Sequence, residues 1–198
     1  MPAERVPEVL AKYEGEIQEL KIKVAEKGQS LADDIARVAA ARDALPSARL
    51  KVDANMGYTL AGALEALRKL CEYGIIYAEQ PVASIEDMAA LRFAIAKEGL
   101  PARIAADESI RKAEDPLKVA RANAADLMVI KAAPLGGVRR ALALVEQAQL
   151  PAVVSSALES SVGIATGASL AASLPTLRYG CGLGTVSYTH LTLPTSDL

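Results

Sequence analysis

Short apolar runs rich in Val and Ile alternate along the chain with longer stretches in which Ala and Leu recur at helical spacing. The short runs predict strands at 20–24, 48–54, 75–80, 102–108, 126–132 and 151–156, with a weaker one at 177–182. The longer stretches predict helices at 4–15, 30–45, 59–73, 84–98, 115–123, 136–148 and 160–173. Strands that alternate with helices in this way favour an α/β fold with a parallel sheet.

Residues at the ends of several predicted helices support these boundaries. Ser30, Thr59 and Ser84 stand directly before helical stretches, where a hydroxyl can accept a hydrogen bond from the first turn. Gly74 and Gly99 follow two of the stretches, and glycine readily takes the left-handed conformation that ends a helix.

The first six predicted strands each carry a polar or ionisable residue near the carboxyl end. These residues are Lys23, Asp53, Glu79, Asp107, Lys131 and Ser155. A (β/α)-barrel gathers the carboxyl ends of its strands into one ring, whereas an open doubly wound sheet spreads them along an edge. Six such residues in succession favour the ring, so we predict a (β/α)-barrel.

Both ends of the chain depart from a complete barrel. An eight-stranded barrel usually needs about 200 to 250 residues, and one helical stretch alone precedes the first predicted strand of this 198-residue chain. We therefore expect an incomplete barrel domain over 1–186 that lacks its first strand. The segment 187–198 resembles translated sequencing-adapter read-through, so we expect a non-native tail, with a genuine strand as the alternative. The single histidine, His190, lies in this tail and is given no role.

Composition narrows the class of protein. Lys and Arg number 22 against 24 Asp and Glu, and this balance argues against nucleic acid or an anionic membrane as the partner. No long uninterrupted apolar run fits a membrane span, and the first residues lack the apolar core of a signal peptide. Two cysteines, Cys71 and Cys181, are typical of a reduced cytoplasmic protein, which is the location we expect.

Three of the strand-end residues are acids on consecutive strands. In a barrel the carboxylates of Asp53, Glu79 and Asp107 would converge, and they would repel one another unless a cation were bound. An incomplete set of hard oxygen ligands is typical of a Mg²⁺ site, and Mn²⁺ would fit similarly. The alternative is that strand-end acids cap the following helices, as Asp107 or Glu108 could do.

Lysines flank this set of acids. Lys23 precedes it by one strand and Lys131 follows it, so a ring would place them on opposite sides of the metal. Lys21 faces the same side as Lys23, and its charge can lower the pKa of that second lysine toward the range of a base. Ordinary polar alternation on an edge strand is the alternative for this pair. A metal with a lysine on either side suits removal of a proton next to a carboxylate, with the metal stabilising the resulting enediolate.

The motifs that carry these residues resemble the enolase superfamily. They are LKIKV, VDAN, YAEQP, AADES, VIKAAPLGG and VVSSALESSVG, spread over about 18–186. The pattern is most similar to the muconate-lactonising branch and, within it, to the actinobacterial o-succinylbenzoate synthase family. That resemblance implies a Mg²⁺-dependent lyase with a small-molecule carboxylate as its partner. The implied reaction is the syn dehydration of 2-succinyl-6-hydroxy-2,4-cyclohexadiene-1-carboxylate to o-succinylbenzoate in menaquinone biosynthesis.

The resemblance also implies a role for each matching position. Asp53, Glu79 and Asp107 match the magnesium ligands, Lys23 matches the base, and Lys131 matches a lysine that stabilises the enediolate. Residues expected around the substrate or beside the metal are Lys21, Asn55, Glu108, Ser155, Ser156 and Gly182–Gly184. The two serines could instead cap the following helix.

Other functions remain open on the sequence. Dipeptide epimerases and N-succinylamino acid racemases of the same superfamily would use the same metal and lysines. A barrel that binds a metal without catalysis is a further alternative. Members of the superfamily carry an N-terminal capping domain that this sequence lacks, so we expect a fragment with poor activity. The oligomeric state is left open.

Overall fold

The computed structural model describes residues 1–13 and 17–185, which fall into two compact units, Met1–Leu127 and the residues from Met128 onward. Each unit is described separately. The predicted tail at 187–198, with His190, lies outside the described residues.

Parallel strands of the first unit pair in the order in which they occur along the chain. They are β1 (Glu19–Lys23), β2 (Arg49–Asp53), β3 (Ile75–Glu79) and β4 (Arg103–Ala106). β2, β3 and β4 lie within their predicted ranges and are shorter than them, and β1 begins and ends one residue before its predicted range. The pairing in chain order is the arrangement expected of strands in a (β/α)-barrel.

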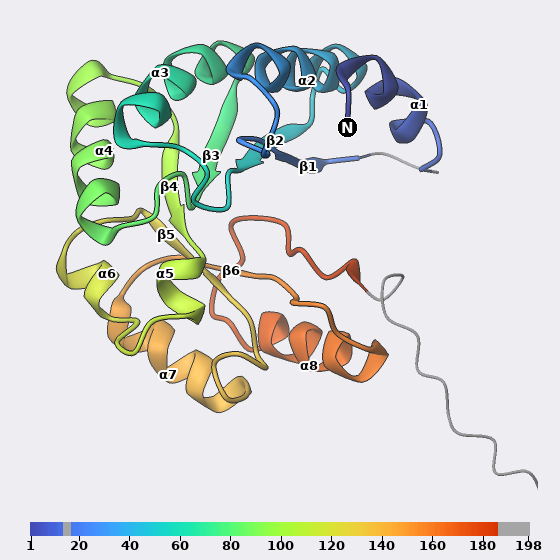
Figure 1. The fold of residues 1–198 in the computed structure, drawn as a ribbon. Coiled ribbons are helices and arrows are strands. Elements are labelled where there is room, and N and C mark those ends of the chain that lie inside the picture. The colour runs from blue at the N-terminus through green and yellow to red at the C-terminus, as the bar shows by residue number, and fades with distance from the viewer. Residues whose placement is uncertain (14–16, 186–198) are drawn as a thin grey trace, which may run out of the picture. The chain divides into compact units, whose positions relative to one another are not determined.

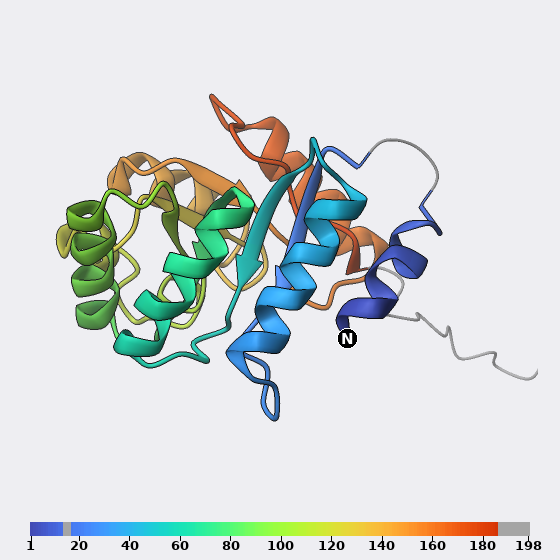
Figure 2. The same ribbon diagram turned by 90° about the horizontal axis from the view of Figure 1, so that it is seen from above.

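The first unit has two short helices before β1, and its other helices follow its strands. They are η1 (Ala3–Arg5), α1 (Val6–Leu10), α2 (Leu31–Ala44), α3 (Leu60–Leu70), η2 (Cys71–Tyr73), α4 (Ile85–Glu98), α5 (Glu108–Arg111) and α6 (Lys118–Arg121). The three long helices, α2, α3 and α4, lie side by side along the outer face of the strands (Figures 1 and 2).

The alternation of side chains along each strand separates the core from the polar face. Leu50 and Val52 of β2 are fully buried, as are Leu67 of α3 and Leu91 of α4. Successive strand residues point to opposite faces, so Asp53 lies on the face away from Val52 and its helices. The helices therefore cover the apolar face of the strands, and the polar side chains at the strand ends lie on the opposite face.

The register of the strands brings their carboxyl ends to one level. Ile22 pairs with Val52 and Lys23 with Asp53, and Asp53 pairs in turn with Glu79. Side chains on the same face of adjacent paired strands are close enough to interact. The register therefore places the predicted base and two predicted metal ligands beside one another.

The predicted helix caps are confirmed. The hydroxyls of Ser30, Thr59 and Ser84 accept hydrogen bonds from backbone N–H groups three residues later, at 3.3, 3.2 and 3.0 Å. Gly74 and Gly99 end η2 and α4 with φ of 68° and 70°, in the left-handed region that favours glycine.

The second unit contains two parallel strands with their helices, apart from the first residue of β5, Leu127, which belongs to the first unit. They are β5 (Leu127–Ile130), α7 (Val138–Ala148), β6 (Ala152–Val154) and α8 (Ser161–Ala172). Ile130 pairs with Val154, and α8 packs against both β6 and α7. Among the helices of the described residues, none combines the length and the apolar character needed to cross a bilayer.

Three local predictions are wrong. The weak strand at 177–182 is reduced to a single bridge between Gly182 and Ser155, because glycines favour extended pairing poorly. The helix expected over 115–123 begins only at Lys118, since the Asp115 carboxylate accepts the N–H of Leu117 at 3.2 Å and forms a turn instead. The short helix α5 replaces the end of the predicted strand at 102–108.

Replacement of Ser30 by Ala tests the cap of α2. Ser30 and Asp33 exchange hydrogen bonds in a capping box, with the Ser30 N–H donating to the Asp33 carboxylate at 2.7 Å. We expect Ser30→Ala to lower the free energy of unfolding by about 1 kcal/mol, measured by urea denaturation. Ser47→Ala, at an exposed loop position, is the control and should change it by less than about 0.5 kcal/mol. Equal effects of the two changes would contradict the assignment.

Candidate active site

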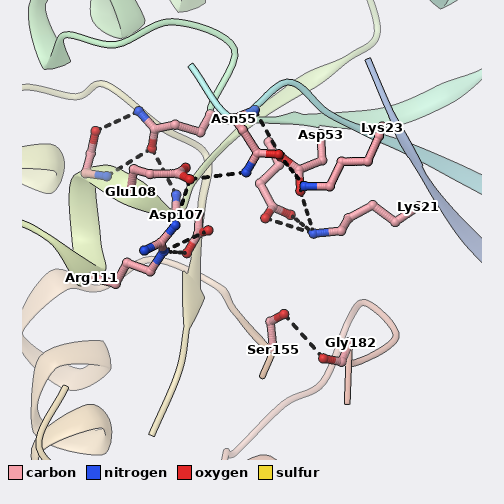
Figure 3. Close-up of polar contacts among 12 residues, drawn as sticks. Lys21, Lys23, Asp53, Asn55, Asp107, Glu108, Arg111, Ser155 and Gly182 are labelled. Carbon is pink, nitrogen blue, oxygen red and sulfur yellow. Dashed lines mark hydrogen bonds and ion pairs between the residues drawn. The ribbon is translucent and has the colours of Figure 1, made fainter. Parts of the chain in front are cut away.

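The Lys21 ammonium joins two acids at the carboxyl ends of neighbouring strands. Its Nζ donates to Asp53 Oδ2 at 2.9 Å and to the two Glu79 carboxylate oxygens at 3.0 and 3.1 Å (Figure 3). The side chains of Asp53 and Glu79 are each only 2% exposed. The structure therefore brings together two of the three predicted metal ligands, Asp53 and Glu79, around the ammonium group of Lys21.

Lys23 contacts the same acid from the end of β1. Its Nζ donates to Asp53 Oδ2 at 2.6 Å and also to Asn55 Oδ1. The Lys23 side chain is 50% exposed, against 34% for Lys21. Both lysines face the acids, as the alternation predicted, and Lys23 is the more accessible amine of the two.

Burial and neighbouring charges shift the pKa values of Lys21, Asp53 and Glu79, and for each residue some of these influences oppose one another. Burial alone would lower the pKa of Lys21, but Glu79 and Asp53 raise it above its ordinary value. Burial would raise the pKa of Asp53, and the two lysines hold it below its usual range. Burial raises the pKa of Glu79 to about 7, and Asp53 and Asp107 add to the rise while Lys21 opposes it. Burial, more than the neighbouring acids, therefore makes Glu79 hard to ionise even with an ammonium beside it.

The third predicted ligand, Asp107, is paired with a guanidinium. Arg111 Nε lies 3.2 Å from both Asp107 carboxylate oxygens, and its Nη2 donates to Glu108 Oε1 at 2.8 Å (Figure 3). Asp107 directly precedes α5, yet its side chain makes no capping hydrogen bond. The capping alternative is therefore wrong for Asp107.

Asn55 links the lysine side of the cluster to the arginine side. Its Nδ2 donates to Glu108 Oε1 at 3.2 Å, which orients the amide so that Oδ1 faces Lys23. The other carboxylate oxygen of Glu108, Oε2, is buried and makes no hydrogen bond within the described residues. A buried oxygen without a donor is costly, and a cation would satisfy it.

The donor set suits a hard divalent cation. Asp53, Glu79 and Asp107 supply only carboxylate oxygens, the ligands that Mg²⁺ prefers. Over residues 1–13 and 17–185, however, no group of three or more His, Cys, Asp and Glu side chains has the arrangement of a metal site. Instead, Lys21 and Lys23 neutralise Asp53 and Glu79, and Arg111 neutralises Asp107, which relieves the repulsion between the acids. The chemistry of the site fits the metal, and the carboxylates would have to exchange partners to hold it.

Sequence analysis missed the residue that supports Asp107. Gln80 is fully buried, and its Oε1 accepts the backbone N–H groups of Asp107 at 3.1 Å and Ser109 at 3.0 Å. Its Nε2 donates to the Ser109 hydroxyl at 2.8 Å. The signal in the sequence was a glutamine next to Glu79 at the end of an apolar strand, where a polar side chain needs internal partners.

The remaining predicted residues lie in the second unit. Lys131 directly follows β5 and is buried, and Ser155 directly follows β6. The hydroxyls of Ser155 and Ser156 donate to the Gly182 carbonyl at 3.3 and 3.0 Å (Figure 3 shows the first). The residue that precedes α8 is Ser160, so the capping alternative is wrong for Ser155 and Ser156.

Comparison with known proteins identifies the family. Residues 3–197 match the family described as Enolase C-terminal domain-like. The chain belongs to this family. An o-succinylbenzoate synthase of Mycolicibacterium smegmatis is 58% identical over 184 residues, which are 92% of this chain and 55% of the relative. The o-succinylbenzoate synthase of Thermobifida fusca is 52% identical over 86% of this chain and 52% of its own length. The chain thus spans about half the length of these curated relatives.

Solved structures share the fold of this chain. A dipeptide epimerase from Enterococcus faecalis V583 superposes with a TM-score of 0.74 at 28% identity, covering 85% of this chain and 48% of the epimerase. A muconate cycloisomerase from Pseudomonas fluorescens gives 0.74 at 31% identity, covering 86% and 47%. The family match and these structures confirm the predicted α/β fold of the (β/α)-barrel type and the resemblance to the enolase superfamily.

Replacement of Arg111 tests how the acids are neutralised. Arg111→Met leaves the buried Asp107 and Glu108 carboxylates without their guanidinium, and we expect it to lower the free energy of unfolding by about 2 kcal/mol at pH 7. Arg121→Met is the matched control, because Arg121 pairs with an exposed Asp115. We expect the control to cost less than about 1 kcal/mol in urea denaturation. A cost for Arg111→Met no larger than the control's would show that this pairing is not needed.

Proposed function

We propose that the chain carries the catalytic part of an o-succinylbenzoate synthase. The enzyme would dehydrate 2-succinyl-6-hydroxy-2,4-cyclohexadiene-1-carboxylate to o-succinylbenzoate in menaquinone biosynthesis. The observation that carries the proposal is the accessible ammonium of Lys23, held on buried Asp53 beside Glu79, in a chain 58% identical to a synthase. A cytoplasmic location is part of the proposal, supported by the free thiols of Cys71 and Cys181.

Asp53, Glu79 and Asp107 would hold Mg²⁺, and Mn²⁺ would suit the same oxygens. When bound, the cation supplies positive charge that holds the substrate carboxylate and stabilises the negative charge that develops beside it. Burial raises the pKa of Glu79, and Asp53 and Asp107 lie near enough to add to the rise. This closeness of three carboxylates supports the assignment. The buried, unpaired Oε2 of Glu108 supports it as well.

Lys23 would act as the base. As a neutral amine, its Nζ takes the proton from the ring carbon that carries the carboxylate, and the electron pair of that C–H bond enters the ring. The C–O bond to the hydroxyl then breaks, and the hydroxide takes the proton that Lys23 removed and leaves as water, which returns Lys23 to the neutral amine. Lys131 would stabilise negative charge on the substrate from its own position after β5. The residues proposed to contact the substrate are Lys21, Asn55, Ser155, Ser156 and Gly182.

Epimerisation is the second candidate, because a dipeptide epimerase shares the fold at a TM-score of 0.74. The same lysines would then remove and return the α-proton of an amino acid residue. Deuterium uptake at that carbon in D₂O distinguishes this reaction from dehydration. A barrel that binds metal without catalysis would show neither reaction.

Replacement of Lys23 by Ala tests the proposed function. Loss of the cyclohexadiene absorbance should require Mg²⁺ and stop on chelation, and Lys23→Ala should lower kcat at least about 100-fold because the base is removed. Lys97→Ala, at an exposed position of α4, is the control and should retain full activity. The assay uses this chain together with any residues that adjoin it in its gene. Persistent dehydration by Lys23→Ala would show that another group is the base, and deuterium exchange without dehydration would favour epimerisation.

Metal binding can be tested apart from activity. With Mg²⁺ at about ten times its Kd, we expect the free energy of unfolding to rise by about 1.4 kcal/mol, measured in urea against a sample with chelator. Glu79→Gln should abolish most of this gain by removing one carboxylate ligand. Glu98→Gln, which alters an exposed ion pair with Arg68, should leave it intact. A gain that survives in Glu79→Gln would place the metal elsewhere.

A further inference from the structure

A buried cluster lies beneath the turn that follows β1, and the reaction proposed above does not use it. It consists of Asp34 and Arg37 from the inner side of α2 and Tyr58 from the loop after β2, and we call it the Asp34 cluster. Asp34 and Arg37 are both buried, which is unusual for charged residues unless they are paired. Asp34 and Arg37 pair with each other, which makes the burial of both charges tolerable.

The Asp34 carboxylate receives three donors. Its Oδ2 accepts from the Tyr58 hydroxyl at 2.7 Å and from the Ala25 backbone N–H at 2.9 Å. Its Oδ1 accepts from Arg37 Nη1 at 3.1 Å, and the same nitrogen donates to the backbone carbonyl of Lys23 at 2.5 Å. Burial and the Asp34 charge raise the pKa of Tyr58 above its usual value, so the phenol stays a donor. The cluster thus holds the peptide groups on either side of Val24.

The turn held by the cluster has a strained conformation. Ala25 has φ of 57°, in the left-handed region that is unfavourable for a residue with a side chain. A Cβ added at Gly57 would lie 2.6 Å from the Ala25 carbonyl oxygen and 2.7 Å from its Cβ, so only glycine fits against this turn. A strained turn persists only where surrounding contacts hold it, and Asp34 supplies one of them directly.

The proposed base depends on this turn for its direction. The Lys23 side chain is 50% exposed, so its own packing restrains it little. Beyond its contacts with Asp53 and Asn55, its position is set by the backbone from which it leaves. Both ends of the Lys23–Val24 peptide group are held. Arg37 donates to the Lys23 carbonyl, and the Val24 N–H donates to the Asp53 carbonyl at 3.0 Å.

We propose that the Asp34 cluster positions Lys23 for proton transfer by holding the backbone turn from Lys23 to Ala25. The inference rests on the proposed function for the role of Lys23 as a base. Asp34, Arg37 and Tyr58 are positioning residues, because they act through the backbone and not on the substrate. A misplacement of a catalytic group by about 1 Å can cost about 100-fold in rate, so a small rearrangement of the turn is enough to matter.

Tyr58→Phe tests the proposal with the smallest change. It removes one donor to Asp34 and should increase the motion of the Lys23 Cε methylene, measured by NMR relaxation in a chain with ¹³C-labelled lysine. The Cε signal of Lys21, two residues earlier on β1 and bound to the same Asp53, should not change. In the activity assay we expect kcat to fall roughly tenfold while KM changes less than about twofold. Tyr73→Phe, which removes a hydroxyl at the end of η2, is the matched control for both measurements.

The outcomes separate this proposal from the proposed function. Greater mobility of Lys23 alone supports positioning, and Asp34→Asn should reproduce it because the amide cannot match the carboxylate as an acceptor for three donors. Unchanged motion of Lys23 in both variants would overturn the proposal, as would an equal loosening of Lys21 and Lys23, which would indicate general destabilisation. If the unsubstituted protein has no dehydratase activity, the proposed function fails, and the relaxation measurement still decides whether the cluster holds Lys23.

Discussion

Repulsion between carboxylates at the ends of neighbouring parallel strands is the constraint around which the first unit is arranged. Asp53 and Glu79 are almost completely withdrawn from water, so solvent does little to screen their charges. Cations make this burial tolerable, with Lys21 and Lys23 reaching from β1 to these two acids, while Arg111 of α5 neutralises Asp107. The same concentration of negative charge that threatens the fold is what makes the site suitable for a divalent cation.

The site also shows how a scaffold helix contributes to chemistry at a strand end. The apolar side of α2 buries Val38 against the sheet, and the same side carries Asp34 and Arg37 to the turn after β1. One helix thus packs the core and restrains the segment from which Lys23 projects. Packing and positioning are properties of the same face, so a change in α2 can alter the site without any contact with it.

Much of the fold and part of the site follow from the sequence alone. The strands were predictable because apolar runs rich in Val and Ile end at polar residues, and the caps at Ser30 and Ser84 because hydroxyls precede amphipathic stretches. Lys23 and Asp53 could be expected to meet, since parallel strands bring their carboxyl ends together. The α/β fold class followed from the alternation of strands and helices, and the family from the resemblance of the motifs to the enolase superfamily.

Other parts of the site depend on orientation that a sequence does not display. Asp33 and Asp34 are neighbours in the first turn of α2 and look equivalent as capping residues. The structure separates them, with Asp33 at the surface on Ser30 and Asp34 buried under β1. The helix α5, with Arg111, has only four residues and is too short to produce a periodic pattern.

The register of β1 has a consequence for how this protein can vary. Leu20 to Lys23 pair residue for residue with β2, and the two lysines share a face while Ile22 occupies the other. An insertion or deletion of one residue between Lys21 and Lys23 would put the two lysines on opposite faces, and one before Lys21 that shifted the β1 register by one residue would direct both ammonium groups into the helix-covered core. Substitutions at most positions leave that parity intact. The length of this strand is therefore under tighter constraint than its composition.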